Sequence, residues 1–111
     1  MKNKEDYFKI LKNIKNYPKS SQRDLAQKVG ISLGKLNYCL KALIDKGHVK
    51  IENFKNNNNK INYFYVLTPR GINEKTKLTI SFMKRKMKEY DELKSEFEKK
   101  NQKEVKGIGN K

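Results

Sequence analysis

The sequence lacks the features of secreted, disulfide-stabilised and membrane proteins. Its single cysteine, Cys39, cannot form an internal disulfide, which is typical of proteins from a reducing cytosol. No window approaches the ~20 consecutive apolar residues that a membrane-spanning helix needs. No apolar stretch of signal-peptide type follows the charged N-terminus, residues 1–6. We therefore expect a soluble, cytoplasmic protein that makes no contact with a membrane.

The patterns that carry catalysis or metal binding are also missing. There is no Ser/His/Asp or Cys/His arrangement at a supported spacing and no glycine-rich phosphate loop, so an enzyme is not predicted. The only histidine, His48, has no Cys, Asp or Glu partner at ligand spacing, so neither a metal nor a cofactor is predicted. Cys39 lies between Leu36 and Leu43 on the flank of an apolar face, where we expect a structural, partly buried thiol instead of a redox sensor.

What the sequence has in excess is positive charge. Its 111 residues, enough for one domain, carry a formal net charge of +15, and 35% of them are hydrophobic. The excess is spread over the chain, from +4 over residues 1–19 to +5 over residues 72–111. Such a field attracts polyanions, namely DNA, RNA or an anionic membrane surface. A general bias toward lysine and asparagine would explain the same charge without any ligand. A sequence motif is therefore needed to distinguish nucleic-acid binding from such a bias.

Two short helices are predicted near the N-terminus from apolar spacing and capping residues. Residues 5–16 form an amphipathic pattern that ends before Pro18. Ser21 opens a Ser-x-x-Asp cap for the second helix, which stops at Gly30. The apolar faces are formed by Tyr7, Ile10, Leu11 and Ile14 in the first helix and by Leu25, Ala26 and Val29 in the second.

The third helix follows at once and completes a helix-turn-helix. Ser32 is its N-cap, it runs over about residues 33–46, and its apolar stripe is Leu36, Leu40, Leu43 and Ile44. Ala26, Gly30 and Leu36 have the residue types and spacing that a close helix crossing, a sharp turn and an anchoring side chain require. A plain helical hairpin can share this spacing, but two caps and the hairpin that follows favour a DNA-binding motif.

The rest of the chain is predicted to be a hairpin and one long helix. The apolar period changes to two over residues 48–52, and an asparagine-rich loop over 53–60 leads to an aromatic strand over 61–67. A helical pattern then runs over about residues 69–101. The fold is mainly α with a small β-hairpin (α+β), a winged helix-turn-helix with a long C-terminal dimerisation helix. Its expected parts are 1–71 (DNA-binding domain), 72–102 (dimerisation helix) and 103–111 (disordered tail).

Three segments carry a family resemblance: Asp24-Leu25-Ala26-x-x-Val29-Gly30-Ile31-Ser32, Leu40-Lys41-Ala42-Leu43-x-x-Lys46-Gly47-x-Val49 and Leu67-Thr68-Pro69-Arg70-Gly71. They resemble the MarR family of bacterial winged-helix regulators over roughly residues 8–98. The stretch 30–47 is similar in particular to the small subgroup associated with extracellular-polysaccharide gene clusters. The resemblance implies a homodimer on a near-palindromic operator, with helix 33–46 in the major groove and the hairpin wing beside it.

Two departures limit what the resemblance implies. Larger members have extra terminal helices that build the dimer and often shape a small-molecule pocket, and this chain is too short for the full set. The existence of an effector therefore stays open. Typical members also carry an Asp-x-Arg element in the wing, whereas residues 55–60 are Lys-Asn-Asn-Asn-Asn-Lys, so a minor-groove arginine is not carried over.

The outward face of helix 33–46 supplies the predicted base contacts. With its apolar stripe inward, the outward residues near its N-terminal half are Ser32, Gly34, Lys35, Asn37, Tyr38 and Lys41. Asn37 can pair with adenine, Lys35 can reach guanine acceptors or phosphates, and Tyr38 can contact a thymine methyl. Further contacts with phosphates are predicted for Ser21, Gln22, Lys55 and Lys60. An ordinary solvated surface is the alternative for each residue.

The long C-terminal helix is predicted to pair with a second copy of the chain. Apolar residues follow a pattern near seven residues that Lys94 breaks and that Leu78, Phe82 and Leu93 widen. The predicted dimerisation residues are Ile80, Met83, Met87, Tyr90, Leu93 and Phe97. The alternative, a single helix held by charge pairs, would leave these residues in water without explanation.

These features predict a sequence-specific, double-stranded DNA-binding transcriptional regulator. It would act as a homodimer, on a polysaccharide-related or neighbouring operon. A winged-helix adaptor for protein interactions is the alternative, because a fold does not fix its function. The outward face of helix 33–46 discriminates between the two, since it carries Lys35 and Lys41 with no acid before Asp45. RNA binding is a weaker possibility, because no stacking platform is evident.

Overall fold

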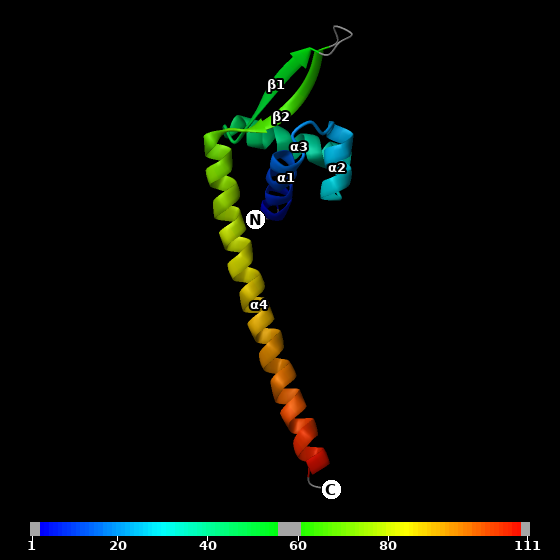
Figure 1. The fold of residues 1–111 in the computed structure, drawn as a ribbon, viewed down its shortest axis with the longest axis vertical. Helices are drawn as coiled ribbons and strands as arrows, with labels where there is room; N and C mark the ends of the chain where they lie inside the picture. The colour runs from blue at the N-terminus through cyan, green and yellow to red at the C-terminus, as the bar shows by residue number, and fades with distance from the viewer. Residues whose placement is uncertain (1–2, 56–60, 110–111) are drawn as a thin grey trace. The chain divides into compact units, whose positions relative to one another are not determined.

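The structure is a computed structural model that describes residues 3–55 and 61–109 of the chain (Figure 1). Its elements are, in order, α1 (Lys4–Asn16), α2 (Gln22–Val29), α3 (Leu33–Asp45), β1 (Val49–Lys55), β2 (Ile61–Leu67) and α4 (Pro69–Gly109). The helices and the two-stranded antiparallel sheet confirm the predicted α+β class. The chain divides into two compact units, Met1–Thr79 and Ile80–Lys111.

Local capping chemistry sets the ends of α2 and α3. The Ser21 Oγ atom accepts a hydrogen bond from the Asp24 backbone N–H at 3.1 Å, and Ser32 Oγ accepts one from the Lys35 N–H at 3.1 Å. Gly30 ends α2 with a φ of 83°, a left-handed conformation that glycine adopts at little cost. The two predicted caps and the tight turn between the helices are therefore confirmed.

One apolar core holds the first unit together. The three short helices turn their predicted apolar faces inward, and β1 and α4 contribute one buried hydrophobic side chain each. The buried hydrophobic residues of this core are Ile10, Leu11, Ile14, Leu25, Ala26, Val29, Leu36, Cys39, Leu40, Leu43, Val49 and Leu78. Leu78, predicted to widen the dimerisation stripe, therefore belongs to this core. Cys39 is wholly buried instead of partly buried, because it faces the centre of the cluster with 0% exposure.

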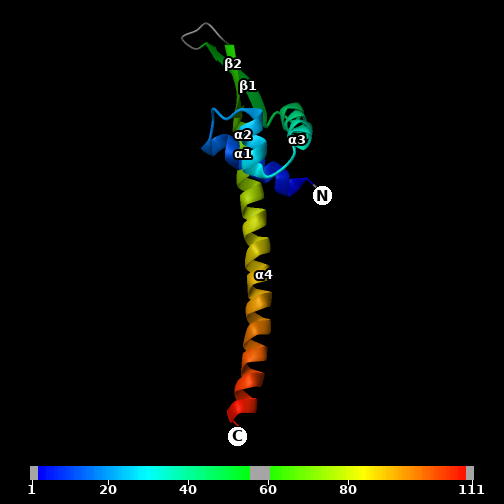
Figure 2. The same cartoon turned by 90° about the vertical axis from the view of Figure 1, so that its right-hand side faces the viewer.

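The strands β1 and β2 pair as an antiparallel hairpin (Figure 2). Their register places Val49 opposite Leu67. Tyr65 and Leu67 pack against the core, whereas Tyr63 is 66% exposed. Apolar residues occupy both faces of β2, so the sequence alone does not distinguish them. Packing distinguishes the two faces of β2, because Tyr65 and Leu67 lie on the face that contacts the core.

Two elements extend past their predicted ends. β1 continues beyond residue 52, because its ladder with β2 runs on to Lys55 opposite Ile61. The last helix was expected to end near Asn101, yet α4 continues to Gly109. Lys103, Glu104 and Lys106 are good helix formers, and a glycine inside a helix costs only about 1 kcal/mol relative to alanine. The glycines near the C-terminus are thus weaker stop signals than the prediction assumed.

The start of α4 is fixed against the end of α3 by a close backbone contact. Thr68 Oγ1 donates a hydrogen bond to the Gly47 carbonyl and accepts one from the Gly71 N–H at 3.0 Å. A Cβ atom built on Gly71 would lie 1.9 Å from the His48 carbonyl oxygen, so only glycine fits. This contact gives a physical reason for the glycine in the segment Leu67 to Gly71.

Candidate DNA-binding surface

The candidate DNA-binding surface, as we define it, consists of the exposed residues at the starts of α2 and α3. α3 buries Leu36, Cys39, Leu40 and Leu43 and leaves the opposite side of its N-terminal half in solvent. All the predicted contact residues on the two helices are exposed, namely Ser21, Gln22, Ser32, Gly34, Lys35, Asn37, Tyr38 and Lys41. Their exposure makes them available to a ligand, and their individual contacts with DNA stay predictions.

Gly34 and Tyr38 lie one helical turn apart and give this surface its relief. The Tyr38 side chain is 63% exposed. A Cβ atom built on Gly34 would meet no atom of the described residues within 4 Å, so packing within the chain does not require glycine here. Residues four apart share one face of a helix. A projecting ring beside a position without a side chain suits the close approach of a large ligand.

Lys35 has a partner that the sequence did not suggest. Its Nζ atom lies 3.4 Å from Asp6 Oδ2, a carboxylate supplied by α1. The Lys35 side chain is 45% exposed, and a surface ion pair of this kind contributes ~0–1 kcal/mol. The outward face of α3 has no acidic residue before Asp45, but in the folded domain the Asp6 carboxylate from α1 offsets part of its positive charge. Lys41 is exposed as well.

Ser21 and Gln22 both have structural roles at the start of α2. Ser21 caps the helix, and Gln22 Nε2 donates a hydrogen bond to Tyr65 Oη on β2. The Gln22 contact ties the hairpin to the helix-turn-helix across a sequence separation of 43 residues. No local pattern could have revealed it. The backbone N–H groups of this first turn still favour an anion through the helix dipole.

The two predicted wing lysines cannot be placed fully. Lys55 is the last residue of β1, but its side chain lies outside the described residues. Lys60 also lies outside them. Their phosphate contacts therefore stay predictions from the sequence.

Residues 8–50 match a family model described as winged helix-turn-helix DNA-binding. The first unit is a winged helix-turn-helix domain. The match covers α1 from Phe8 onward, all of α2 and α3, and the first two residues of β1. The β-hairpin formed by β1 and β2 supplies the wing. No curated protein matches the sequence.

Two solved structures are similar to this fold. One is Staphylococcus aureus MarR in complex with salicylate and kanamycin, with a TM-score of 0.58 and 21% identity over 74% of this chain and 53% of that one. Another is the PcaV transcriptional regulator of Streptomyces coelicolor with its natural ligand, with a TM-score of 0.59 and 15% identity over 71% and 55%. The chain thus spans about half the length of these relatives. The likeness establishes the fold.

Cys39 and His48 lie in the winged-helix unit but outside the candidate surface. Burial raises the pKa of the Cys39 thiol, and the nearby Asp6 carboxylate adds to this effect, so the thiolate is disfavoured. Burial lowers the pKa of His48. The Glu74 carboxylate, whose Oε2 atom lies 3.9 Å from His48 Nε2, opposes this shift. His48 Nδ1 is buried without a hydrogen-bond partner among the described residues.

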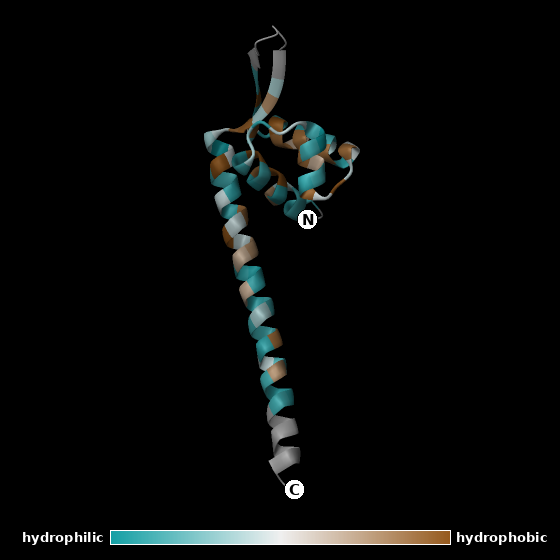
Figure 3. Cartoon of the chain, turned by 45° about the vertical axis from the view of Figure 1, so that its right-hand side comes forward, coloured by the Kyte–Doolittle hydropathy of each residue, from teal (hydrophilic) through white to brown (hydrophobic). Residues whose placement is uncertain are grey.

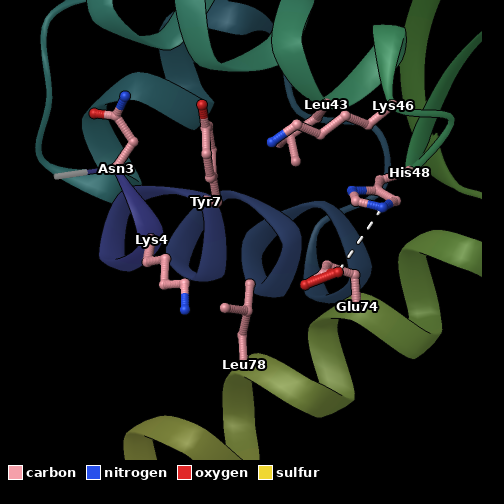
Figure 4. Close-up of a pocket in the computed structure, with 8 residues that line it drawn as sticks. All are labelled: Asn3, Lys4, Tyr7, Leu43, Lys46, His48, Glu74 and Leu78. Carbon is pink, nitrogen blue, oxygen red and sulfur yellow. Dashed lines mark ion pairs between the residues drawn. The ribbon is translucent and has the colours of Figure 1, made fainter. Parts of the chain in front are cut away.

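His48 also borders a cavity of about 420 Å³ in the same unit (Figure 4). Its lining residues are Asn3, Lys4, Tyr7, Leu43, Lys46, His48, Glu74 and Leu78. None of the predicted DNA contacts is among them, so the cavity and the candidate surface are separate features. Within the described residues, no group of three or more His, Cys, Asp or Glu side chains is placed to hold a metal. The helices among these residues include none long and apolar enough to cross a membrane.

Proposed function

We propose that the protein is a cytoplasmic, non-enzymatic transcriptional regulator that binds double-stranded DNA sequence-specifically as a homodimer. The observation that carries the proposal is the exposed N-terminal half of α3 inside a winged helix-turn-helix domain. In this motif the second helix enters the major groove and its N-terminal residues reach the base edges. The proposed target is a polysaccharide-related or neighbouring operon, which rests only on the resemblance of residues 30–47.

Specificity is assigned to α3 and affinity to the residues around it. Asn37 offers a bidentate amide for adenine, and Tyr38 offers a ring edge for a thymine methyl. Lys35 exchanges Asp6 for a guanine or a phosphate, an exchange that an exposed pair allows at small cost. The N–H groups at the start of α2 and the wing lysines, Lys55 and Lys60, contact phosphates in this proposal.

The dimer is assigned to the second unit. The exposed fractions of its stripe residues are 44% for Ile80, 55% for Met83, 58% for Met87, 63% for Tyr90, 65% for Leu93 and 66% for Phe97. Figure 3 shows hydrophobic residues recurring along α4 among hydrophilic ones. A stripe of this length on one exposed helix favours a partner with a matching stripe. Two recognition helices in one dimer would then engage two half-sites together.

The test is selection of bound duplexes from a random pool, followed by footprinting of the full chain on the selected sequence. We expect a two-fold protected site and strong discrimination against unrelated duplexes. Asn37→Ala and Tyr38→Ala should each reduce that discrimination by roughly 1–3 kcal/mol. Lys12→Ala, which removes an exposed charge on the outer side of α1, is the matched control and should preserve discrimination.

The wing lysines should behave differently from the α3 residues. Lys55→Ala and Lys60→Ala should weaken binding to all duplexes and flatten the salt dependence by about one unit of slope per lost phosphate contact. Equal affinity for every duplex, or no enrichment during selection, would favour the adaptor function instead. Specificity that depends on the wing and not on α3 would reverse the assigned roles.

A further inference from the structure

The apolar stripe of the second unit has a symmetry of its own. The coiled-coil seam within it is formed by Ile80, Met83, Met87, Tyr90, Lys94 and Phe97, separated alternately by three and four residues. Lys94 is the one polar position of this seam, and Leu93 lies directly beside it. Counted from the midpoint between Lys88 and Glu89, the first three positions mirror the last three. The stripe is therefore self-complementary about a two-fold axis at that midpoint. Such an axis aligns two helices that run in opposite directions.

The charges of α4 change sign at the same midpoint. Residues 80–88 carry four basic side chains and no acidic one. Residues 89–98 carry five acidic side chains and one basic one. We call these the basic block and the acidic block. In a parallel pair the basic block of one helix would face the basic block of the other, and the two acidic blocks would also face each other. In an antiparallel pair the basic block of each helix faces the acidic block of the other.

From these two observations we infer that two copies of α4 form an antiparallel coiled coil centred between Lys88 and Glu89. The occupant of the apolar stripe is thus a second copy of this chain. The inference deepens the proposed homodimer and rests on it. Ile80 then faces Phe97 of the second copy, and Met87 faces Tyr90. Lys84 and Asp91 flank the seam at equivalent heptad positions, so each can pair with the other across the interface.

Lys94 is the polar residue of the seam, and the antiparallel arrangement places it well. It faces Met83 of the second copy, where its aliphatic stem can cover the thioether while the ammonium reaches solvent. In a parallel, in-register pair, Lys94 would face Lys94, and two like charges would meet inside the seam. The stripe therefore agrees with the charge blocks on the direction of the helices.

The direction has a consequence for DNA binding. At a rise of 1.5 Å per residue, the two copies of Thr79 in the antiparallel coil lie about 28 Å apart along its axis. In a parallel coil they would be separated only by the distance between helix axes, about 8–10 Å. The direction of the coil therefore sets the distance between the two points at which the winged-helix units join it.

Cross-linking tests the direction in the full-length chain. Ile80→Cys and Phe97→Cys are made separately and treated with a short bifunctional thiol reagent, alone and mixed. We expect a cross-link only in the mixture, joining position 80 of one chain to position 97 of the other. The parent chain, whose native Cys39 is buried, is the control. Self-cross-linking of either variant alone would overturn the antiparallel arrangement.

A second experiment leaves the apolar stripe intact. Glu89→Lys, Asp91→Lys and Glu92→Lys together should weaken dimerisation at low salt by at least about tenfold, because like blocks then face each other. Adding Lys84→Glu, Arg85→Glu and Lys86→Glu should restore it, since the blocks are complementary again. A dimer that is unaffected by the first set overturns the inference. Sedimentation and footprinting distinguish failure of this inference from failure of the proposed function. If only the direction is wrong, the protein is still a dimer that protects the operator. If the protein sediments as a monomer, the proposed homodimer is wrong.

Discussion

The two units of the chain distribute their apolar residues in opposite ways. In the first unit, three short helices and a hairpin bury a compact cluster that includes Leu36, Cys39 and Leu43. In the second, none of the side chains of residues 80–101 is buried. Phe82 is half-buried, because the Arg85 guanidinium covers its ring with Cζ 4.8 Å from the ring centre. One unit satisfies its hydrophobic residues within the chain, whereas the other presents them. The proposed homodimer would cover in the second unit what the first covers by itself.

The largest expected effect tests this difference with one leucine from each unit. Leu36→Ala should destabilise the first unit by roughly 2–5 kcal/mol, because it leaves a cavity in a closed core. Leu93→Ala, at a residue that is 65% exposed, should change the stability of the dilute monomer by less than about 0.5 kcal/mol. Chemical unfolding of both variants over a range of protein concentrations measures the contrast. A large concentration-independent loss for Leu93→Ala would show that its stripe is covered within the chain.

Glycines supply a second contrast, now within the winged helix. Gly71→Ala should cost about 1–3 kcal/mol or more, because the new methyl would collide with the His48 carbonyl. Gly34→Ala meets open space and should raise stability by up to about 1 kcal/mol through helix propensity. If Gly34 faces DNA, its methyl should nevertheless weaken operator binding. Thermal unfolding and operator titration of the same two proteins separate the effects, and unchanged affinity for Gly34→Ala would remove it from the interface.

Much of the fold could be predicted because its signals are local. Ser21 and Ser32 cap helices within three residues of themselves, and Gly30 turns the chain where it stands. The contacts that reshape the candidate surface join residues far apart in sequence. Asp6 reaches Lys35 from α1, and Gln22 reaches the wing. Periodicity and spacing carry no information about such pairs, which depend on how the elements pack.

Asp6→Asn examines one of these distant pairs and should have a smaller effect. The substitution removes a negative charge 3.4 Å from Lys35, so the lysine no longer exchanges partners when it meets DNA. We expect operator affinity to rise by a few-fold, in keeping with the ~0–1 kcal/mol of an exposed ion pair. Lys35→Ala should abolish the benefit of Asp6→Asn in a double-mutant cycle. An equal gain in the Lys35→Ala background would mean that Asp6 acts on DNA directly.

The smallest effect concerns pH and again separates the two units. His48 is the only histidine, so protonation of imidazole between pH 7 and 5 can affect the first unit alone. Burial holds its pKa below the ordinary 6.5, with Arg70 and Lys46 acting in the same direction and Glu74 opposing them. The unfolded chain therefore binds the proton more readily than the folded one, and stability should fall as the pH drops through about 6.5. His48→Gln should flatten this part of the profile, measured by unfolding at pH 7.5, 6.5 and 5.5. An unchanged slope in His48→Gln would show that other groups cause the dependence.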